Sequence, residues 1–133
     1  MKRLTKYSLL LLTAFLTFTF CFAQKSKEKK SGKYDFQGAY FNNRARVKQG
    51  LKWGFIDRNN ALVVGLKYNE VENFNDGLAK VRKEHFWGLI DTTGREIIPI
   101  AFDWVGDFEG DRAKVTRLGQ TVFIDRTGKI VGK

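Results

Sequence analysis

Cysteine, proline, histidine and methionine are nearly missing from this 133-residue sequence, which has one residue of each. The cysteine, Cys21, lies in an N-terminal apolar run, so the remainder of the chain can form no intrachain disulfide and has no thiol nucleophile. From Tyr34 onward there is no serine either. Ser-His-Asp and Cys-His catalytic arrangements are therefore excluded from that part of the chain, and we expect a protein that is not an enzyme.

A metal centre after Tyr34 would have to combine carboxylates with the one imidazole, that of His85. His85 follows Glu84 in an expected bend between two strands, where a solvated turn residue is favoured over a metal ligand or a catalytic base. Two carboxylates about 5 to 10 Å apart can catalyse hydrolysis of a glycosidic bond. The candidates are Asp57, Asp91 and Asp125, but their positions in turns explain them without catalysis. We expect no catalytic residues, no metal and no cofactor.

The first 23 residues have the layout of a secretory signal peptide. A basic start precedes an apolar run from Ser8 to Phe22 and the small residue Ala23. We expect residues 1–23 to be cleaved off and the protein to be exported to the periplasm, cell envelope or extracellular space. An uncleaved anchor is the alternative, because the run approaches the length of about 17 residues that can span a bilayer. Lipidation is disfavoured, because Phe20 precedes Cys21 where a lipobox has a small residue.

The formal net charge of +10 is unevenly distributed along the chain. Residues 24–33 are rich in lysine and serine, which is typical of a basic disordered linker. Residues 34–133 hold 16 Lys and Arg against 13 Asp and Glu, a net charge of +3. A domain that binds nucleic acid usually concentrates positive charge on its folded face. We therefore expect no specific nucleic-acid partner, and membrane contact only through an uncleaved signal segment.

A six-residue motif recurs at a constant offset of 34 residues. The motif is KWGFID at 52–57, FWGLID at 86–91 and, in weakened form, QTVFID at 120–125. The third copy has Thr121-Val122 in place of Trp-Gly, as terminal repeats are often atypical. Residues 34–133 therefore form one repeat domain. Its expected units are about 40–73, 74–107 and 108–133, with 34–39 as a partial preceding unit.

Apolar and polar residues alternate within each unit, which favours strands over helices. The motif aspartate begins an Asp-x-x-Gly turn at 91–94 and 125–128, and Asn60 replaces the glycine at 57–60. This pattern is typical of a tight hairpin turn, since Asp accepts backbone hydrogen bonds and Gly, or next best Asn, tolerates the left-handed conformation. The next strand, Glu96 to Phe102, contains Pro99, which implies an edge position or a bulge.

We predict an all-β fold, a tandem array of about three 34-residue hairpin or meander repeats with about three short strands each. The units must stack, because one alone cannot bury its apolar face. The array is either an open stack or a closed small β structure, since the strand Tyr34 to Tyr40 could pair with the last unit.

The repeated Trp-Gly pair, followed by Phe/Leu-Ile-Asp and a glycine turn, resembles the WG (KWG) β-repeat family from Tyr34 to Lys133. The signature positions are Trp53, Gly54, Asp57, Trp87, Gly88, Asp91, Gly94, Asp125 and Gly128. The resemblance implies a bacterial, often exported β-repeat array without an established common activity. Binding or scaffolding is the implied role, and the resemblance brings no active site.

Trp53 and Trp87 are best interpreted as packing between adjacent hairpins, with the glycine after each allowing close backbone approach. Trp104 differs, because its equivalents are Glu70 and Phe36, and a position that accepts Glu is expected to be exposed. Trp104 is the candidate contact residue. The sequence favours an exported protein-interaction or scaffolding module in the cell envelope with an unknown protein partner. The alternative is a carbohydrate or cell-wall binding module, whose partner is a cell-wall polysaccharide.

Overall fold

Three antiparallel sheets make up residues 32–133, the part of the chain that the computed structural model describes, and no helix occurs in that range. The strands of the first sheet are β1 (Phe36–Phe41), β2 (Arg44–Gln49), β3 (Lys52–Ile56) and β4 (Leu62–Tyr68). Those of the second are β5 (Glu70–Val71), β6 (Leu78–Lys83), β7 (Phe86–Asp91) and β8 (Glu96–Phe102). Those of the third are β9 (Trp104–Glu109), β10 (Arg112–Arg117), β11 (Gln120–Asp125) and β12 (Ile130–Gly132). The predicted all-β repeat fold is confirmed.

The expected signal peptide and nearly all of the expected linker lie outside the described residues. Within residues 32–133, no helix has the length and apolar character needed to cross a membrane.

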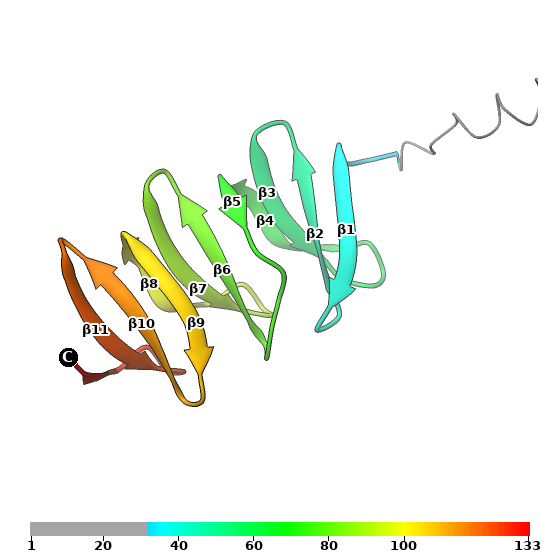
Figure 1. Cartoon of the computed structure of the whole chain (residues 1–133). Coiled ribbons are helices and arrows are strands. Elements are labelled where there is room, and N and C mark those ends of the chain that lie inside the picture. The colour runs from blue at the N-terminus through cyan, green and yellow to red at the C-terminus, as the bar shows by residue number, and fades with distance from the viewer. Residues whose placement is uncertain (1–31) are drawn as a thin grey trace, which may run out of the picture. The chain divides into compact units, whose positions relative to one another are not determined.

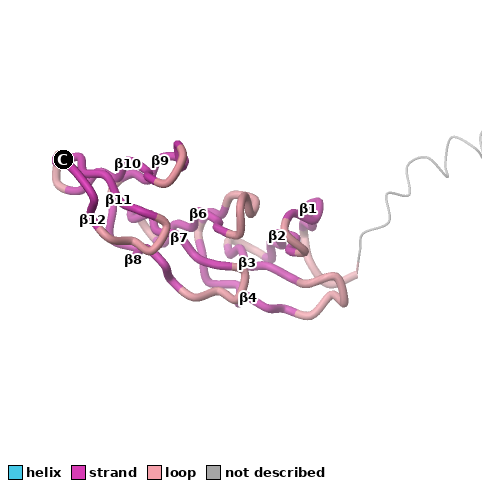
Figure 2. The backbone as a smooth tube through the Cα atoms, turned by 90° about the horizontal axis from the view of Figure 1, so that it is seen from below, coloured by secondary structure: helices cyan, strands magenta, loops and turns pink. Residues whose placement is uncertain are grey.

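The sheets follow one another along an open stack, with β1 at one end and the C-terminus at the other (Figures 1 and 2). Each sheet is a meander whose strands pair in chain order. Tyr34 to Tyr40 does not pair with the third sheet, because β1 pairs with β2. The closed form of the array is therefore wrong, and the open stack is correct.

Each sheet has four strands, not the expected three, and begins four residues before the expected unit starts of 40, 74 and 108. The strand at Tyr34 to Tyr40 is part of the first sheet, and its counterparts β5 and β9 open the next two. A single residue, Asn69 or Asp103, separates the last strand of one sheet from the first strand of the next. Because so short a junction carries no Gly or Pro signal, the two strands cannot be separated in the sequence.

Apolar side chains of adjacent sheets meet in two cores, since a half-buried strand turns every second residue inward. The core between the first and second sheets contains Phe55, Val64, Tyr68, Val71, Phe74, Ala79, Val81 and Ile90. The core between the second and third contains Leu89, Ile98, Val105, Ala113, Val115 and Ile124. We call the side of a sheet that faces the preceding sheet its front face, and the opposite side its back face. Each sheet except the last thus covers the front face of its successor.

The front face of the first sheet has no preceding sheet, yet its Ala45, Val47 and Ile56 are 0% exposed. Tyr34 packs against this cluster. Tyr34 lies in 34-residue register with Tyr68, the residue that ends β4 and packs on the next sheet. Tyr34, together with Tyr40 and Leu66 of the first sheet itself, therefore covers this face in place of a preceding unit, and this end of the stack is capped.

Pro99 lies in β8, which is the last strand of its sheet and pairs with β7 alone. The pairing is irregular between Trp87 and Leu89 and again between Leu89 and Ile90. An edge strand with a bulge tolerates the missing N–H of proline, as the sequence predicts.

Candidate functional site

The two signature tryptophans lie half-buried on the back faces of their sheets, against the two cores. Arg46 and Lys48 place their cations 5.7 and 5.5 Å from the centre of the Trp53 ring. Arg82 lies 5.7 Å from the centre of the Trp87 ring. Each ring is thus held between apolar neighbours and cations of its own sheet, which is a structural role.

The signature glycines lie directly beneath the last strand of their own sheet. A Cβ atom on Gly54 would lie 2.4 Å from the carbonyl oxygen of Val64, and one on Gly88 would lie 2.7 Å from that of Ile98. The nearest obstructing atom is a backbone oxygen in both cases, so no side chain fits without moving a strand. Glycine is therefore required wherever β4 or β8 passes over the motif strand.

The signature aspartates organise the hairpin turn that follows each motif. The Oδ1 atom of Asp91 accepts hydrogen bonds from the N–H groups of Thr93 and Arg95, at 2.9 and 3.1 Å. Asp57 and Asp125 accept the equivalent pairs. The Thr93 hydroxyl also donates to Asp91 at 2.6 Å and, with the N–H groups, holds the pKa of this carboxyl below its usual value. These oxygens are engaged in their own turns.

Asp125 repeats this arrangement with Thr127, whose hydroxyl donates to it at 2.6 Å. That hydrogen bond is the main reason why the pKa of Asp125 is also lowered.

The glycines that close these turns also touch the preceding sheet. Gly94 and Gly128 have φ angles of +89° and +86°, which L side chains rarely adopt. A Cβ atom on Gly128 would lie 2.5 Å from the carbonyl oxygen of Ile97, and one on Gly94 would lie 3.1 Å from Val64. Asn60 is the equivalent residue of the first sheet and has a φ of +61°. No sheet precedes the first one in residues 32–133, so the side chain of Asn60 has room there. The turn glycine therefore serves both the hairpin and the stack.

A second set of residues, not predicted from the sequence, lies directly before the first strand of each sheet. The side chains of Asp35, Asn69 and Asp103 accept hydrogen bonds from backbone N–H groups in the hairpin between the second and third strands, at 2.7 to 2.8 Å. Their constant spacing of 34 residues was the available signal.

His85 is exposed in the bend between β6 and β7, as expected. No group of three or more His, Cys, Asp or Glu side chains is placed to hold a metal ion in the part of the chain from 32 to 133.

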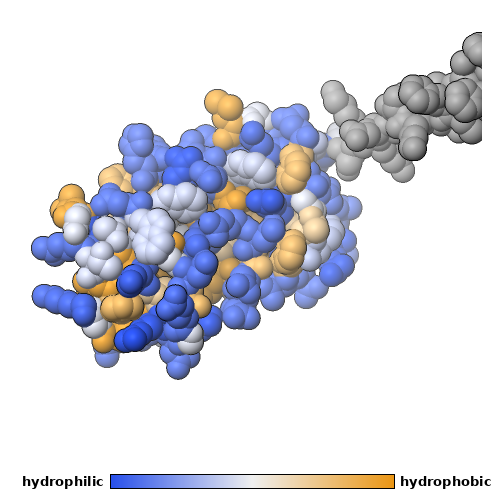
Figure 3. All heavy atoms as spheres, viewed as in Figure 1, coloured by the Kyte–Doolittle hydropathy of each residue, from blue (hydrophilic) through white to orange (hydrophobic). Residues whose placement is uncertain are grey.

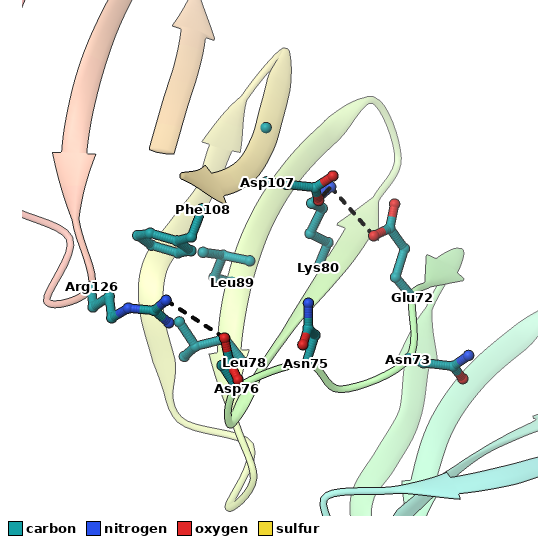
Figure 4. Close-up of a pocket in the computed structure, with 11 residues that line it drawn as sticks. Glu72, Asn73, Asn75, Asp76, Leu78, Lys80, Leu89, Asp107, Phe108 and Arg126 are labelled. Carbon is teal, nitrogen blue, oxygen red and sulfur yellow. Dashed lines mark hydrogen bonds and ion pairs between the residues drawn. The ribbon is translucent and has the colours of Figure 1, made fainter. Parts of the chain in front are cut away.

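A narrow cleft of about 120 Å³ lies between the second and third sheets (Figure 4). Lys80 reaches across it, with its Nζ atom 2.6 Å from Asp107 and 3.3 Å from Glu72. Burial acts to lower the pKa of Lys80, but the hydrogen bond to Asp107 and the nearby charges raise it overall. Arg126 lies 3.7 Å from Asp76 on the other side. The cleft is thus bridged by the chain's own ion pairs and serves to join the sheets.

The back face of the third sheet is the one back face in residues 32–133 that no following sheet covers. Phe123 stands there at the position of the buried Phe55 and Leu89. It is half-buried, and the cations of Arg112 and Lys114 lie 4.7 and 5.8 Å from its ring centre.

Trp104 lies on this same face and is 51% exposed. Its ring lies over Gly106, because a Cβ atom there would be 2.6 Å from the ring. A shallow hollow of about 170 Å³ joins the two aromatics; it is lined by Trp104, Gly106, Asp107, Glu109, Arg112, Lys114 and Phe123. We call this surface the Trp104 face. Apolar side chains are visible at this end of the stack, at the lower left of Figure 3.

A second hollow of about 410 Å³ opens beside the short strand β12, and we call it the β12 groove. Its lining consists of Phe102, Arg117, Leu118, Gln120, Val122 and Ile130. Leu118 and Ile130 are 86% and 61% exposed. Two hollows with apolar residues at their rims therefore belong to the third sheet.

A family model described as "WG containing repeat" matches residues 53–84 and 87–119. No curated protein and no solved structure matches this chain.

Proposed function

The chain belongs to the WG containing repeat family, and from this premise we propose that it is an exported, non-enzymatic module for protein interaction or scaffolding. The observation that carries the proposal is the Trp104 face. The first two sheets have their back faces covered by a following sheet, whereas the third presents a half-exposed tryptophan. Exposed aromatic side chains next to charged groups are the usual anchors of protein interfaces.

The chemistry of the chain supports a binding role over catalysis. The signature aspartates are engaged in turns, and His85 is exposed in the bend between β6 and β7. The ion pairs of the cleft in Figure 4 join two sheets. The Trp104 face has no such internal role, so we assign it to contact with a partner.

The basic start, the apolar run from Ser8 to Phe22 and Ala23 support export. Mass spectrometry of the protein from cell-envelope and culture fractions tests this step. We expect a mature chain that starts at Gln24. A chain that keeps residues 1–23 in the membrane fraction would point to an anchor.

Quantitative pull-down with the full chain tests the interaction. Trp104→Ala should reduce capture of the partner, because truncating an interface anchor commonly costs about 2 kcal/mol or more, roughly thirtyfold in affinity. Leu51→Ala is the matched control, since Leu51 is an 82% exposed apolar residue of the first sheet. Unchanged capture by Trp104→Ala would remove Trp104 as the anchor.

A carbohydrate or cell-wall binding module is the second candidate. The Trp104 ring is 51% exposed beside Gly106, and Glu109 and Arg112 line the same hollow. An aromatic platform flanked by polar groups is suited to a sugar ring. Co-sedimentation with peptidoglycan and a panel of polysaccharides tests it, and absence of the protein from every pellet would refute it.

A further inference from the structure

The ion pairs within residues 32–133 all lie outside the first sheet. Each of them joins residues of the second sheet to one another or to the third sheet. Residues 34–68, which hold the first sheet, have six Lys and Arg against two Asp, a net charge of +4. Residues 69–102, which hold the second, have four Lys and Arg against six Asp and Glu, a net charge of −2. The first sheet therefore has an excess of positive charge that its own carboxylates do not balance.

Two cations on the back face of the second sheet show how such charges are balanced in this chain. Lys80 lies between Glu72 and Asp107, as Figure 4 shows. The Nη2 atom of Arg82 lies 2.9 Å from a carboxylate oxygen of Glu70. Two of these carboxylates come from β5 or the residue after it, and the third comes from β9 of the next sheet. Both cations thus have counterions supplied by the chain itself.

The first sheet keeps these two cations and lacks the three carboxylates. Arg46 and Lys48 are the counterparts of Lys80 and Arg82 in the 34-residue register. The residues at the positions of the three carboxylates are Phe36, Gly38 and Asn73. None of these side chains can carry a negative charge. Within residues 32–133, Arg46 and Lys48 accordingly form no ion pair.

The guanidinium group of Arg46 lies against aromatic rings, and no carboxylate contacts it in the described part of the chain. Its central carbon is 5.8 Å from the centre of the Phe36 ring and 5.7 Å from that of the Trp53 ring. Its Nη1 atom donates one long hydrogen bond, of 3.5 Å, to the carbonyl oxygen of Val71. Its buried Nε atom has no hydrogen-bond partner in residues 32–133. The rings do not replace a counterion, because Arg82 lies equally close to the second signature tryptophan and still pairs with a carboxylate.

An extended acidic segment matches the arrangement of these two cations. Arg46 and Lys48 are two positions apart on β2, so their Cα atoms are about 7 Å apart and their side chains share one face. Two acidic residues two positions apart on an extended segment have the same spacing. Glu70 and Glu72 show this spacing in the second sheet. Carboxylates also form strong, charge-assisted hydrogen bonds with guanidinium groups.

We propose that the back face of the first sheet binds an extended acidic segment of a partner protein through Arg46 and Lys48. Carboxylates of the segment supply the negative charge that Glu70 and Glu72 supply in the second sheet. An apolar side chain of the segment contacts the Phe36 ring, which is 42% exposed. The inference rests on the proposed interaction function and names the chemistry of one contact with the partner. The site lies on a different sheet from the Trp104 face.

The second sheet supplies a probe for this site. A peptide with the sequence of residues 69–73, NEVEN, with both ends blocked, carries two glutamates two positions apart. NMR titration into the full chain should show saturable amide shifts concentrated in β1 and β2. The uncharged peptide NQVQN should bind about tenfold more weakly or worse, because it cannot form charge-assisted hydrogen bonds. Raising NaCl from about 50 to about 500 mM should weaken binding of NEVEN, because salt screens exposed charges.

Variants of the protein locate the binding. Arg46→Gln should weaken it about tenfold, and Arg46→Lys, which keeps the charge, should restore most of it. Lys52→Gln is the matched control and should bind as the unchanged protein does, since Lys52 is an exposed cation on the other face of the same sheet. Asn73→Asp, a change of nearly equal size, should also weaken binding. It restores the counterpart of Asp107, so the chain then supplies its own carboxylate to Arg46.

Three results would overturn the inference: no binding of NEVEN, equal binding of both peptides, or equal binding by the Arg46→Gln and Lys52→Gln variants. Binding of polyphosphate without binding of NEVEN would overturn it as well, because the site would then select a phosphate polymer. If the peptide fails while capture of a partner still depends on Trp104, the acidic contact is refuted and the proposed function stands. If the peptide binds but capture depends on neither Trp104 nor Arg46, the acidic site stands and the proposed function fails.

Discussion

Replacing Gly54 with alanine tests whether the glycine of the motif is required by packing. The new Cβ atom would lie 2.4 Å from the carbonyl oxygen of Val64 and 2.9 Å from the carbonyl carbon of Gly65. The oxygen would have to retreat by roughly 1 Å to reach ordinary contact. Because the obstructing atoms are backbone, β4 must shift as a unit or lose pairing with β3.

The cost follows from two opposing effects. Overpacking at a site that cannot yield costs about 3 kcal/mol, the upper part of the usual range. Replacing glycine with alanine also lowers the conformational entropy of the unfolded chain, which stabilises the folded state by about 0.4 to 1 kcal/mol. We expect a net loss of about 2 kcal/mol in the free energy of unfolding. For a domain of this size, that loss lowers the melting temperature by about 8 to 16 °C.

Gly65→Ala is the matched control, one strand away. A Cβ atom on Gly65 would have no neighbouring atom within 4 Å, and the residue has no positive φ angle. This change should leave stability unaltered or raise it by about 0.5 kcal/mol. Urea denaturation followed by circular dichroism measures both variants. A loss below about 1 kcal/mol for Gly54→Ala, or an equal loss for the control, would refute the packing argument.

Three further predictions concern the turns and a buried hydroxyl. Gly128→Ala should lower the melting temperature more than Gly50→Ala. Both residues have positive φ angles, but only a Cβ atom on Gly128 would meet backbone, at 2.5 Å from the carbonyl oxygen of Ile97. Equal losses would show that contact of this turn with the preceding sheet does not require glycine. The two turn aspartates with lowered pKa contribute stability that is present above their unfolded pKa of about 3.9 and is lost as pH falls through the lower folded pKa. Replacing Thr93 and Thr127 with valine should flatten this acid limb of a stability-against-pH curve, and an unchanged limb would contradict the assignment. Tyr68→Phe should keep or raise stability by up to about 1 kcal/mol in urea melts, because the buried hydroxyl has no hydrogen-bond partner in residues 32–133; a clear loss would show that the hydroxyl is needed.

Much of the fold could be predicted from the sequence because the repeat period is constant. The Asp-x-x-Gly turns, the edge position of Pro99 and the bend at His85 follow from local rules about turns and proline. The number of strands did not follow, because Asn69 and Asp103 join strands of different sheets without a conventional turn. The role of Tyr34 as a cap was not predicted either, because its register with Tyr68 does not by itself show which face of the first sheet it covers.

The candidate surface was only partly predictable. Exposure of Trp104 was expected because Glu70 has the same place in the second sheet. The β12 groove was not expected, because it depends on where β12 stops pairing and on Val122 replacing a glycine. In the sequence, Val122 reads only as a degenerate copy of the motif. The structure gives a reason for the glycine at the equivalent position, because β8 crosses directly over Gly88. The position of such a groove depends on which strands pair and for how long, which residue types alone do not show.

Site-specific photo-cross-linking in living cells tests most directly whether the third sheet binds a partner protein. A benzophenone amino acid replaces Trp104 in one chain and the exposed Leu51 of the first sheet in the control. We expect a discrete protein adduct from position 104 and none from position 51. No adduct at 104, equal adducts at both positions, or an adduct made only with polysaccharide would contradict the account.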